Sequence, residues 1–280
     1  MDLNEAILHA QLVNAAYAID PKDVTNHAGD LVPADSRTHQ VVTSIFANDL
    51  ATDMHPDRGD QRVSIGLILQ DAYAGDVVIA IRGTEGVHEW IHDAQFFPVQ
   101  CPFMPAAGNT EDGFTDMYSS MRTGVDRTSP AVVAALPKIK FPRPITSLTI
   151  CGHSLGGALA TLLALDIAVN TIDKDFNFPP SVYTYASPRT GDIQFVNVYN
   201  HAVPDTVRIA NRIDLVPKLP LPPLYEHVLG LYDLSSITIL PPRFLIRPEI
   251  PCQHILTSYL YLLSLQAGGT ILPLQPTCVP

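Results

Sequence analysis

The sequence has few positive charges and no hydrophobic run of membrane-spanning length. Its 17 lysines and arginines stand against 28 aspartates and glutamates, which gives a formal net charge of −11. An acidic surface repels phosphates, so we expect no nucleic-acid partner and no general attraction to anionic bilayers. The apolar run at residues 255–265 is too short to cross a bilayer, so no integral membrane segment is expected.

The sequence also shows no interdomain linker and no recognisable targeting signal, and it contains few cysteines. No serine- or glycine-rich tract, charge block or repeat divides the 280 residues, of which 46% are hydrophobic, so we predict one domain over residues 1–280. The chain starts without the basic residues of a signal peptide, which leaves a cytoplasmic protein, a mature secreted chain or export by another route. Of four cysteines, Cys151 is expected to be buried and reduced, whereas Cys101, Cys252 and Cys278 could pair only in an oxidising compartment.

Strand and helix patterns alternate along the chain. Strands are predicted near 41–47, 63–70, 76–82, 147–151, 182–186, 205–210 and 236–240, and helices at 3–18, 114–124 and 156–168. A buried apolar strand needs helices on both faces of its sheet. The pattern therefore favours an α/β fold with a mostly parallel central sheet flanked by helices.

A G-x-S-x-G pentapeptide at residues 152–156 joins an apolar strand to an alanine- and leucine-rich helix. This context is typical of a nucleophile elbow, a strained turn that exposes a serine at the N-terminus of a helix. Gly152 and Gly156 would be small because a side chain there would collide with the neighbouring strand or helix. The pattern predicts Ser154 as a nucleophile. The alternative is a glycine-rich turn that merely contains a serine.

A serine hydroxyl needs an orienting acid, which follows the nucleophile in sheets of this kind. Asp214 comes after a predicted strand and should reach the same sheet edge as Ser154. Asp205 begins a strand, at the wrong edge, and Asp192 lies in what looks like a turn. Asp214 is therefore the predicted acid, and an Asx turn before the Val-Pro bend is its alternative role.

A base must also follow the acid, and two histidines do so. His227 lies in a Tyr-Glu-His-Val segment, whereas His254 stands between the last predicted strand and an amphipathic helix, where a mobile loop could carry it. That position favours His254 but leaves His227 open.

Several further motifs accompany the elbow. They are the apolar strand 76–84 followed by Trp90-Ile91 and Asp93, the pair Gly113-Phe114, the turn 187–191 and the segment 214–220. Together they resemble the class 3 lipase family, the α/β-hydrolase group that includes triacylglycerol lipases of filamentous fungi, over residues 7–265. The resemblance implies an α/β-hydrolase fold, with Ser154 as nucleophile, Asp214 as acid and His254 as base. The signal-bearing, disulfide-rich layout of the secreted fungal members is absent.

Acyl transfer also needs two hydrogen-bond donors for the oxyanion. One should be the backbone N–H of Leu155, the residue after the nucleophile. The resemblance makes the N–H of Thr84 the other, and Gly83 beside it permits a close approach. The alternative for Thr84 is a strand-end threonine that satisfies its own backbone.

Residues 85–95 carry two competing signals. Val87, Trp90, Ile91 and Ala94 share one face of a short helix, which the resemblance makes a lid over the site. Ordinary surface packing of an amphipathic helix is the alternative. The same stretch contains H-E-x-x-H at residues 88–92, but it is short for a zinc-protease helix and lacks a third ligand.

These observations predict a serine carboxylester hydrolase, specifically a triacylglycerol lipase that cleaves acylglycerol esters through an acyl-enzyme at an oil–water interface. No cofactor or metal is implied. A phospholipase A1 or a feruloyl-type aryl esterase would use the same fold and residues, and a catalytically silent binding protein is the non-enzymatic alternative. The proline-dense stretch 217–223 is predicted to form a wall of the acyl groove, or else a structural loop.

Overall fold

The computed structural model describes residues 1–49, 62–84, 96–171, 178–234, 246 and 249–279. Its main sheet has the strand order β1-β2-β3-β4-β7-β8-β9-β10. Pairings from β1 to β4 are antiparallel and those from β4 to β10 are parallel, so the sheet is mostly parallel, as predicted. The strands are β1 (Leu31–Ala34), β2 (Arg37–Asn48), β3 (Arg62–Asp71), β4 (Asp76–Ile81), β7 (Ser147–His153), β8 (Ser181–Tyr185), β9 (Thr206–Asn211) and β10 (Leu231–Leu234). A separate hairpin pairs β5 (Pro98–Gln100) with β6 (Asn109–Glu111).

Helices follow or flank these strands. The α-helices are α1 (Leu3–Tyr17), α4 (Asp112–Ser120), α5 (Val132–Ala135), α6 (Leu155–Asn170), α7 (Ile193–Ala202), α8 (Ile250–His254) and α9 (Leu256–Ala267). Short 3₁₀ turns lie at Pro105–Ala107, Leu136–Lys138, Val216–Lys218 and Pro276–Cys278. In the described part of the chain, no helix is both long and apolar enough to cross a membrane.

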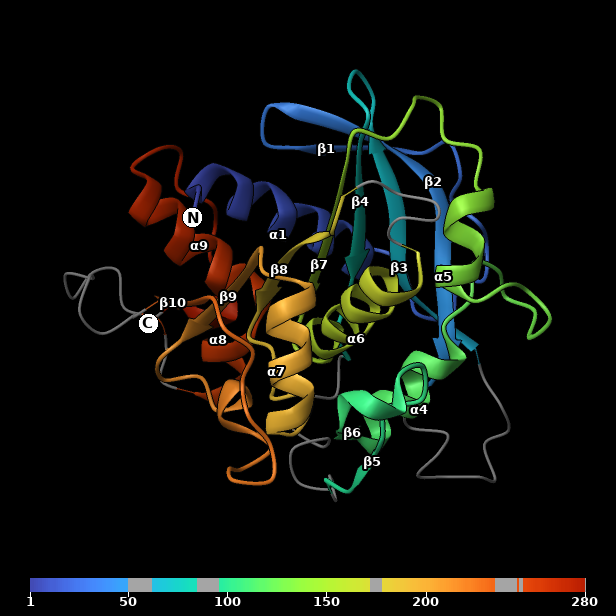
Figure 1. Ribbon diagram of the computed structural model, residues 1–280. Helices are drawn as coiled ribbons and strands as arrows, with labels where there is room; N and C mark the ends of the chain where they lie inside the picture. The colour runs from blue at the N-terminus through green and yellow to red at the C-terminus, as the bar shows by residue number, and fades with distance from the viewer. Residues whose placement is uncertain (50–61, 85–95, 172–177, 235–245, 247–248, 280) are drawn as a thin grey trace.

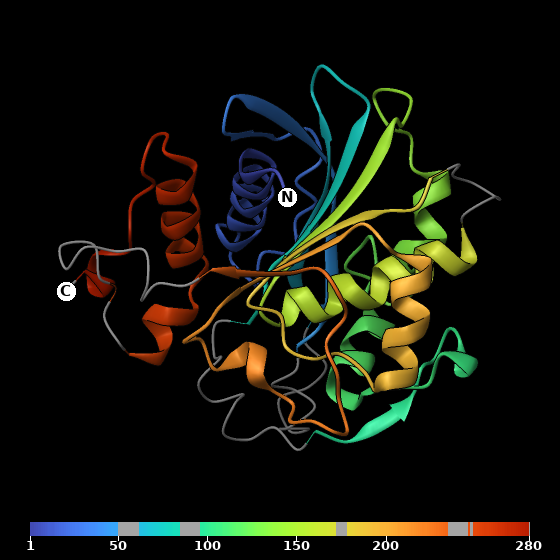
Figure 2. The ribbon, with the colours of Figure 1, turned by 60° about the vertical axis from the view of Figure 1, so that its left-hand side comes forward.

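The sheet is covered on both faces (Figures 1 and 2). Helices α4, α6 and α7 lie on one side, and α1 and α9 lie on the other. In β4, Val77, Ile79 and Ile81 belong to the core beneath α6, whereas Val78 and Ala80 belong to the core beneath α1. Because side chains alternate between two buried faces, this strand is apolar at every one of these positions.

Most predicted elements are present with boundaries shifted by a few residues, but the helix predicted at 114–124 is too long. Helix α4 ends at Ser120, because the backbone N–H and C=O of Arg122 both form hydrogen bonds with the backbone of Phe46 on β2. These hydrogen bonds extend the edge of the sheet and prevent another helical turn. The predicted strand at 236–240 lies outside the described residues.

Parallel strands place their C-terminal ends together, at the lower edge of the sheet in Figure 1. The connections that start at this edge include the segment with Thr84 after β4, the elbow after β7, the turn 187–191 after β8 and the long segment 212–230 after β9. Functional side chains in open α/β sheets gather at such an edge, and this is where the predicted site residues lie.

Candidate active site

The elbow places Ser154 between β7 and α6 in a strained conformation. Its φ is 57°, in the left-handed region that residues with a Cβ rarely adopt. A Cβ added at Gly152 would stand 2.1 Å from the carbonyl oxygen of Gly156, and one at Gly156 would stand 2.4 Å from that of Ile81. Both glycines are therefore required by the close approach of other backbone. The Ser154 side chain is not exposed as expected: only 1% of the residue is accessible, because neighbouring groups enclose the turn.

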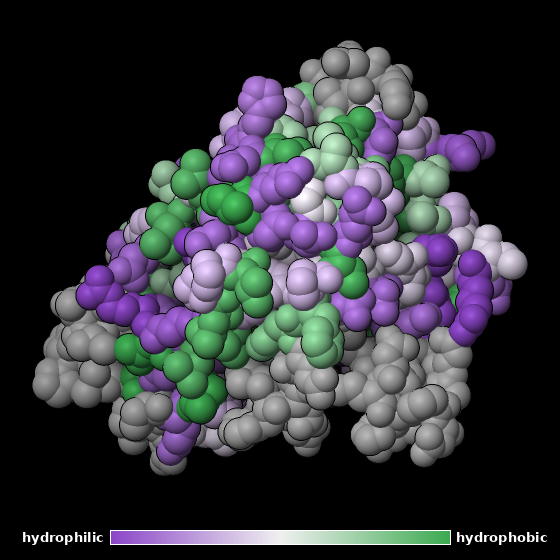
Figure 3. Space-filling model, turned by 60° about the horizontal axis from the view of Figure 1, so that its bottom comes forward, coloured by the Kyte–Doolittle hydropathy of each residue, from purple (hydrophilic) through white to green (hydrophobic). Residues whose placement is uncertain are grey.

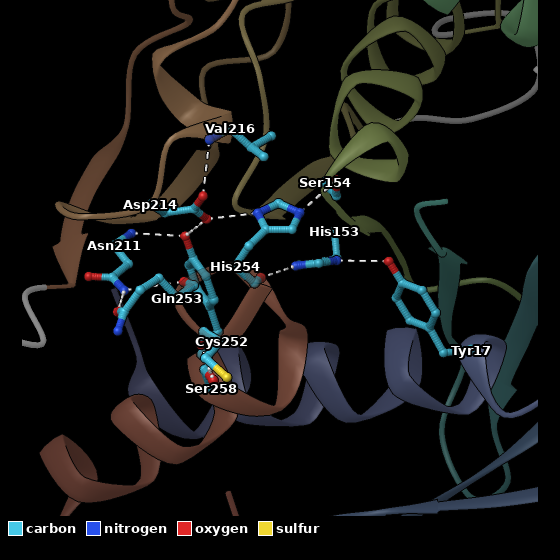
Figure 4. A network of polar contacts seen from close by, with 11 residues as sticks. Tyr17, His153, Ser154, Asn211, Asp214, Val216, Cys252, Gln253, His254 and Ser258 are labelled. Carbon is cyan, nitrogen blue, oxygen red and sulfur yellow. Dashed lines mark hydrogen bonds and ion pairs between the residues drawn. The ribbon is translucent and has the colours of Figure 1, made fainter. Parts of the chain in front are cut away.

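The side chains of Ser154, His254 and Asp214 come from separate segments and form one row, with His254 in the middle (Figure 4). His254 Nε2 lies 2.9 Å from Ser154 Oγ, and His254 Nδ1 lies 2.8 Å from Asp214 Oδ2. The three residues are between 1% and 3% exposed. A buried hydroxyl, imidazole and carboxylate linked in this order have the geometry in which a histidine accepts the serine proton while the carboxylate holds the imidazolium.

The carboxylate of Asp214 is fully engaged. Besides His254, it accepts hydrogen bonds from the Tyr259 hydroxyl (2.8 Å) and the Val216 N–H (3.0 Å). The Tyr259 oxygen in turn accepts the N–H of Asn211 at 3.0 Å. Burial, together with the charge of Asp214, raises the pKa of Tyr259 well above its usual value, so its hydroxyl remains a donor. These hydrogen bonds fix the Asp214 carboxylate in one orientation, in which Oδ2 faces the imidazole of His254.

His254 lies on a helix rather than in the mobile loop expected from the sequence. It is the last residue of α8, a short helix that Pro251 helps to start and that is closed by a hydrogen bond from the Ile255 N–H to the Pro251 carbonyl. Two residues before His254, Cys252 forms a disulfide with Cys278. This bond ties the C-terminal segment to the helix that carries the imidazole. Cys101 and Cys151 are buried and free, as expected for Cys151.

The other candidate residues lie elsewhere. His227 Nε2 donates to the carbonyl of Pro217 at 2.6 Å, and no bond links it to Ser154. Asp192 caps α7 by accepting from the Phe195 N–H, so it is a helix cap rather than a simple turn residue. Asp205 accepts a hydrogen bond from Ser181 at the opposite end of the sheet.

The two predicted oxyanion donors flank the elbow. Leu155 is the first residue of α6, where backbone N–H groups have no helical partner. Thr84 follows β4, and its neighbour Gly83 packs against the elbow, because an added Cβ there would stand 2.9 Å from the Ser154 Cβ. Thr84 also lines the cavity described next. Their role as oxyanion donors stays a prediction.

A cavity of about 420 Å³ adjoins His254 and Thr84. Its wall is built from α1, α8, the start of α9 and the C-terminal segment, including Asn14, Ile250, Leu256 and Gln275. No residue of the stretch 217–223 lines this cavity, and the role of that stretch as a wall of the acyl groove stays a prediction. The volume is within the range of small-molecule sites.

The predicted lid residues Val87, Trp90 and Ile91 lie outside the described residues, as does the H-E-x-x-H motif at 88–92. Within the described ranges, no group of three histidine, cysteine, aspartate or glutamate side chains is arranged to hold a metal ion.

A chain of buried hydrogen bonds behind the elbow was not predicted. The Tyr17 hydroxyl accepts the Gly83 N–H (2.8 Å) and donates to His153 Nδ1 (2.8 Å), and His153 Nε2 donates to the His254 carbonyl (2.8 Å). Burial, reinforced by the nearby His254, lowers the pKa of His153 well below 6.5, so this imidazole is neutral and can both accept and donate. The chain connects α1 and the strand end before Thr84 to the backbone of His254. The position of His153 inside the pentapeptide was the one available signal.

We expect Tyr17→Phe to lower kcat about tenfold with little change in KM. The substitution leaves the Gly83 N–H and His153 Nδ1 without a partner, which costs roughly 1–3 kcal/mol and loosens the predicted oxyanion strand. Steady-state ester hydrolysis and a thermal melt would check this. The matched control is Tyr73→Phe, since Tyr73 is exposed in the β3–β4 turn at the opposite edge. An unchanged kcat in Tyr17→Phe would contradict the positioning role.

Buried histidines should also make the fold sensitive to acid. Burial lowers the pKa of His9 and of His227 from 6.5 to about 3, and His153 is shifted in the same direction. The unfolded chain binds these protons below pH 6.5, so the stability that neutral imidazoles contribute is lost as the pH falls from 6.5 towards 3. Burial raises the pKa of Glu111 to about 7, which acts in the opposite sense, but burial also lowers the pKa of His39, so it is one group against four.

His9 and His227 should therefore each cost about 3 kcal/mol at about pH 4.5, His153 acts in the same direction, and Tm should fall by several degrees between pH 7 and that pH. Thermal melts at the two pH values measure the fall. It should be smaller in His9→Gln and unchanged in His201→Gln, because His201 is exposed at the end of α7. The same fall in all three chains would show that His9 is not involved.

Comparisons with known proteins agree with this geometry. Residues 78–223, more than half of the chain, match the family "Lipase (class 3)". The secreted mono- and diacylglycerol lipase A of Penicillium camembertii is 30% identical over 231 residues, which cover 79% of this chain and 68% of that protein. Phospholipase A1-Igamma1 of Arabidopsis thaliana is 35% identical over 52% of this chain and 32% of its own length. The crystal structure of a mutant form of MDLA from Penicillium cyclopium superposes with a TM-score of 0.65, at 26% identity, over 84% of this chain and 80% of that one.

The chain spans 44% or less of the length of several curated relatives, including proteins from Fusarium solani, rice and Arabidopsis. The fold is that of the α/β-hydrolase fungal lipases, and the family match covers the elbow, Asp214 and the turn 187–191 between them. The chain therefore belongs to the class 3 lipase family.

Proposed function

We propose that this protein hydrolyses the carboxylic esters of acylglycerols through a covalent acyl-enzyme on Ser154. The observation that carries the proposal is the strained, buried Ser154 hydroxyl within 2.9 Å of an imidazole whose other nitrogen meets a carboxylate. Strain in the backbone and burial of three polar groups both cost stability, and a chemical role accounts for that cost. Similarity to acylglycerol lipases supports the choice of substrate.

The reaction follows from the positions of these groups. Ser154 Oγ attacks the ester carbonyl carbon while its proton passes to His254 Nε2, and Asp214 holds the resulting imidazolium. The carbonyl oxygen gains the negative charge and is met by the N–H groups of Leu155 and Thr84. The C–O bond to the alcohol then breaks as His254 returns the proton to the leaving oxygen. Water, deprotonated by the same histidine, cleaves the acyl-serine and releases the acid.

A phospholipase A1 activity is the second candidate, because a relative of that name matches half of the chain. The two activities separate in one experiment. Purified protein is offered p-nitrophenyl esters from C2 to C16, a triolein emulsion and phosphatidylcholine. An acylglycerol lipase should hydrolyse triolein faster than phosphatidylcholine, and the opposite order would favour the phospholipase. A feruloyl-type esterase would prefer an ester of an aromatic acid, for which methyl ferulate is added to the panel, and failure with every ester would leave a binding protein.

We place the substrate at an oil–water interface. Supporting this, exposed apolar side chains border the sheet edge that carries Ser154: Phe97, Ile193, Leu215, Leu221 and Leu224. Figure 3 shows this lower face, where hydrophobic patches are interspersed with hydrophilic side chains. Water-soluble esters need no such border, whereas contact with lipid would remove it from water.

A further inference from the structure

The connection between β9 and β10 presents an uncharged, exposed tip beside the candidate site. Four consecutive residues, Leu221-Pro222-Pro223-Leu224, are exposed, and the two leucines are 66% and 62% accessible. No side chain from residue 219 to residue 225 carries a charge, and the flanking Lys218 and Glu226 cancel each other. The tip begins seven residues after Asp214 and reaches the lower edge of the molecule in Figure 1.

Hydrogen bonds at the foot of the loop hold the tip away from the body of the protein. The Arg189 N–H donates to the Leu219 carbonyl at 2.7 Å, and its guanidinium donates to the carbonyls of Pro220 (2.8 Å) and Lys218 (2.5 Å). His227 donates to the carbonyl of Pro217 at 2.6 Å. The base of the loop is thus fixed to the turn after β8, and the leucines are kept in solvent by the backbone itself.

The backbone of the tip suits a non-aqueous surrounding. An N–H group without a partner is costly in hydrocarbon, and three of the five residues from 220 to 224 are prolines, which have no N–H. The carbonyl groups at the foot of the loop already accept hydrogen bonds from Arg189. Two large apolar side chains on a backbone with few donors can therefore leave water at small cost, while a charged tip could not.

We propose that Leu221-Pro222-Pro223-Leu224 is a lipid-insertion loop that docks the protein on neutral or zwitterionic lipid surfaces next to the site. This inference rests on the proposed function and adds the contact surface and the kind of lipid. The absence of cations on the tip and the net charge of −11 select against anionic headgroups. The loop and Asp214 share one connection, so docking brings the site to the surface.

Binding is measured by flotation with phosphatidylcholine vesicles and with vesicles that also contain phosphatidylserine, using Ser154→Ala protein so that no lipid is consumed. In this background, Leu221→Ser with Leu224→Ser should weaken binding to phosphatidylcholine by about tenfold or more. The matched control is Leu31→Ser, because Leu31 is 65% exposed on β1 at the opposite edge of the sheet. It should bind as the parent does, and phosphatidylserine should weaken binding of every chain.

Because the assay needs no hydrolysis, its result is independent of the proposed reaction. Unchanged vesicle binding in the double variant, or an equal loss in Leu31→Ser, would overturn the docking loop even if esters are hydrolysed. Tighter binding to phosphatidylserine would overturn the choice of lipid. Sedimentation velocity without lipid tests whether the loop instead contacts a second copy of this chain. A dimer in the parent that becomes a monomer in the double variant, while vesicle binding is unchanged, would also overturn the proposal. In the active background, loss on triolein should exceed loss on a dissolved C4 ester.

Discussion

Replacing Ser154 by alanine should lower kcat for ester hydrolysis by about 10⁶-fold, the scale seen when a serine hydrolase loses its nucleophile. The hydroxyl is the attacking group in the proposed reaction, and no other serine is hydrogen-bonded to His254 in the described part of the chain. Rates on p-nitrophenyl butyrate, with active-site concentration checked by protein assay, measure the loss.

The fold should survive this change. Alanine removes one hydrogen bond and keeps the Cβ in the same strained turn, so Tm should move by only a few degrees. A large fall in Tm would make the kinetic result uninformative, and Ser154→Cys then serves as the conservative variant. Activity within tenfold of the parent in a well-folded Ser154→Ala protein would exclude this serine as nucleophile.

The second large effect separates the two histidines. His254→Ala should cost nearly as much as Ser154→Ala, and the double variant should lose little more, because residues that act as one unit are not additive. His227→Gln is the matched control, since His227 is a partly buried imidazole that donates to a backbone carbonyl which an amide can still reach. It should retain more than about a tenth of the activity. The reverse ranking would assign the base to His227.

Local patterns were enough to predict where Ser154 and Asp214 lie in the fold. The pentapeptide and its flanking strand and helix placed Ser154 in a strained turn, because these elements leave little choice of residues there, and its role as nucleophile stays a prediction. The position of Asp214 after a strand placed it at the correct edge, since parallel strands share their direction. Both inferences used sequence separations of a few residues.

Contacts between distant segments were not predictable in this way. Nothing in the sequence around Tyr17 indicates that α1 contacts an elbow more than a hundred residues away. Likewise, nothing around Tyr259 indicates that its hydroxyl donates to Asp214, 45 residues away. The proline-dense stretch was assigned to a groove wall from its apolar composition. Leu221 in this stretch and Leu224 directly after it are exposed, which its composition alone does not indicate, and the groove-wall role stays a prediction.

The most direct test of the account is covalent labelling by a fluorophosphonate probe, followed by peptide mass spectrometry. The account predicts one probe per chain, attached to Ser154, and a labelling rate that falls steeply in His254→Ala because the hydroxyl then lacks its base. Labelling at a different serine, or an undiminished rate at Ser154 without His254, would contradict the central claim.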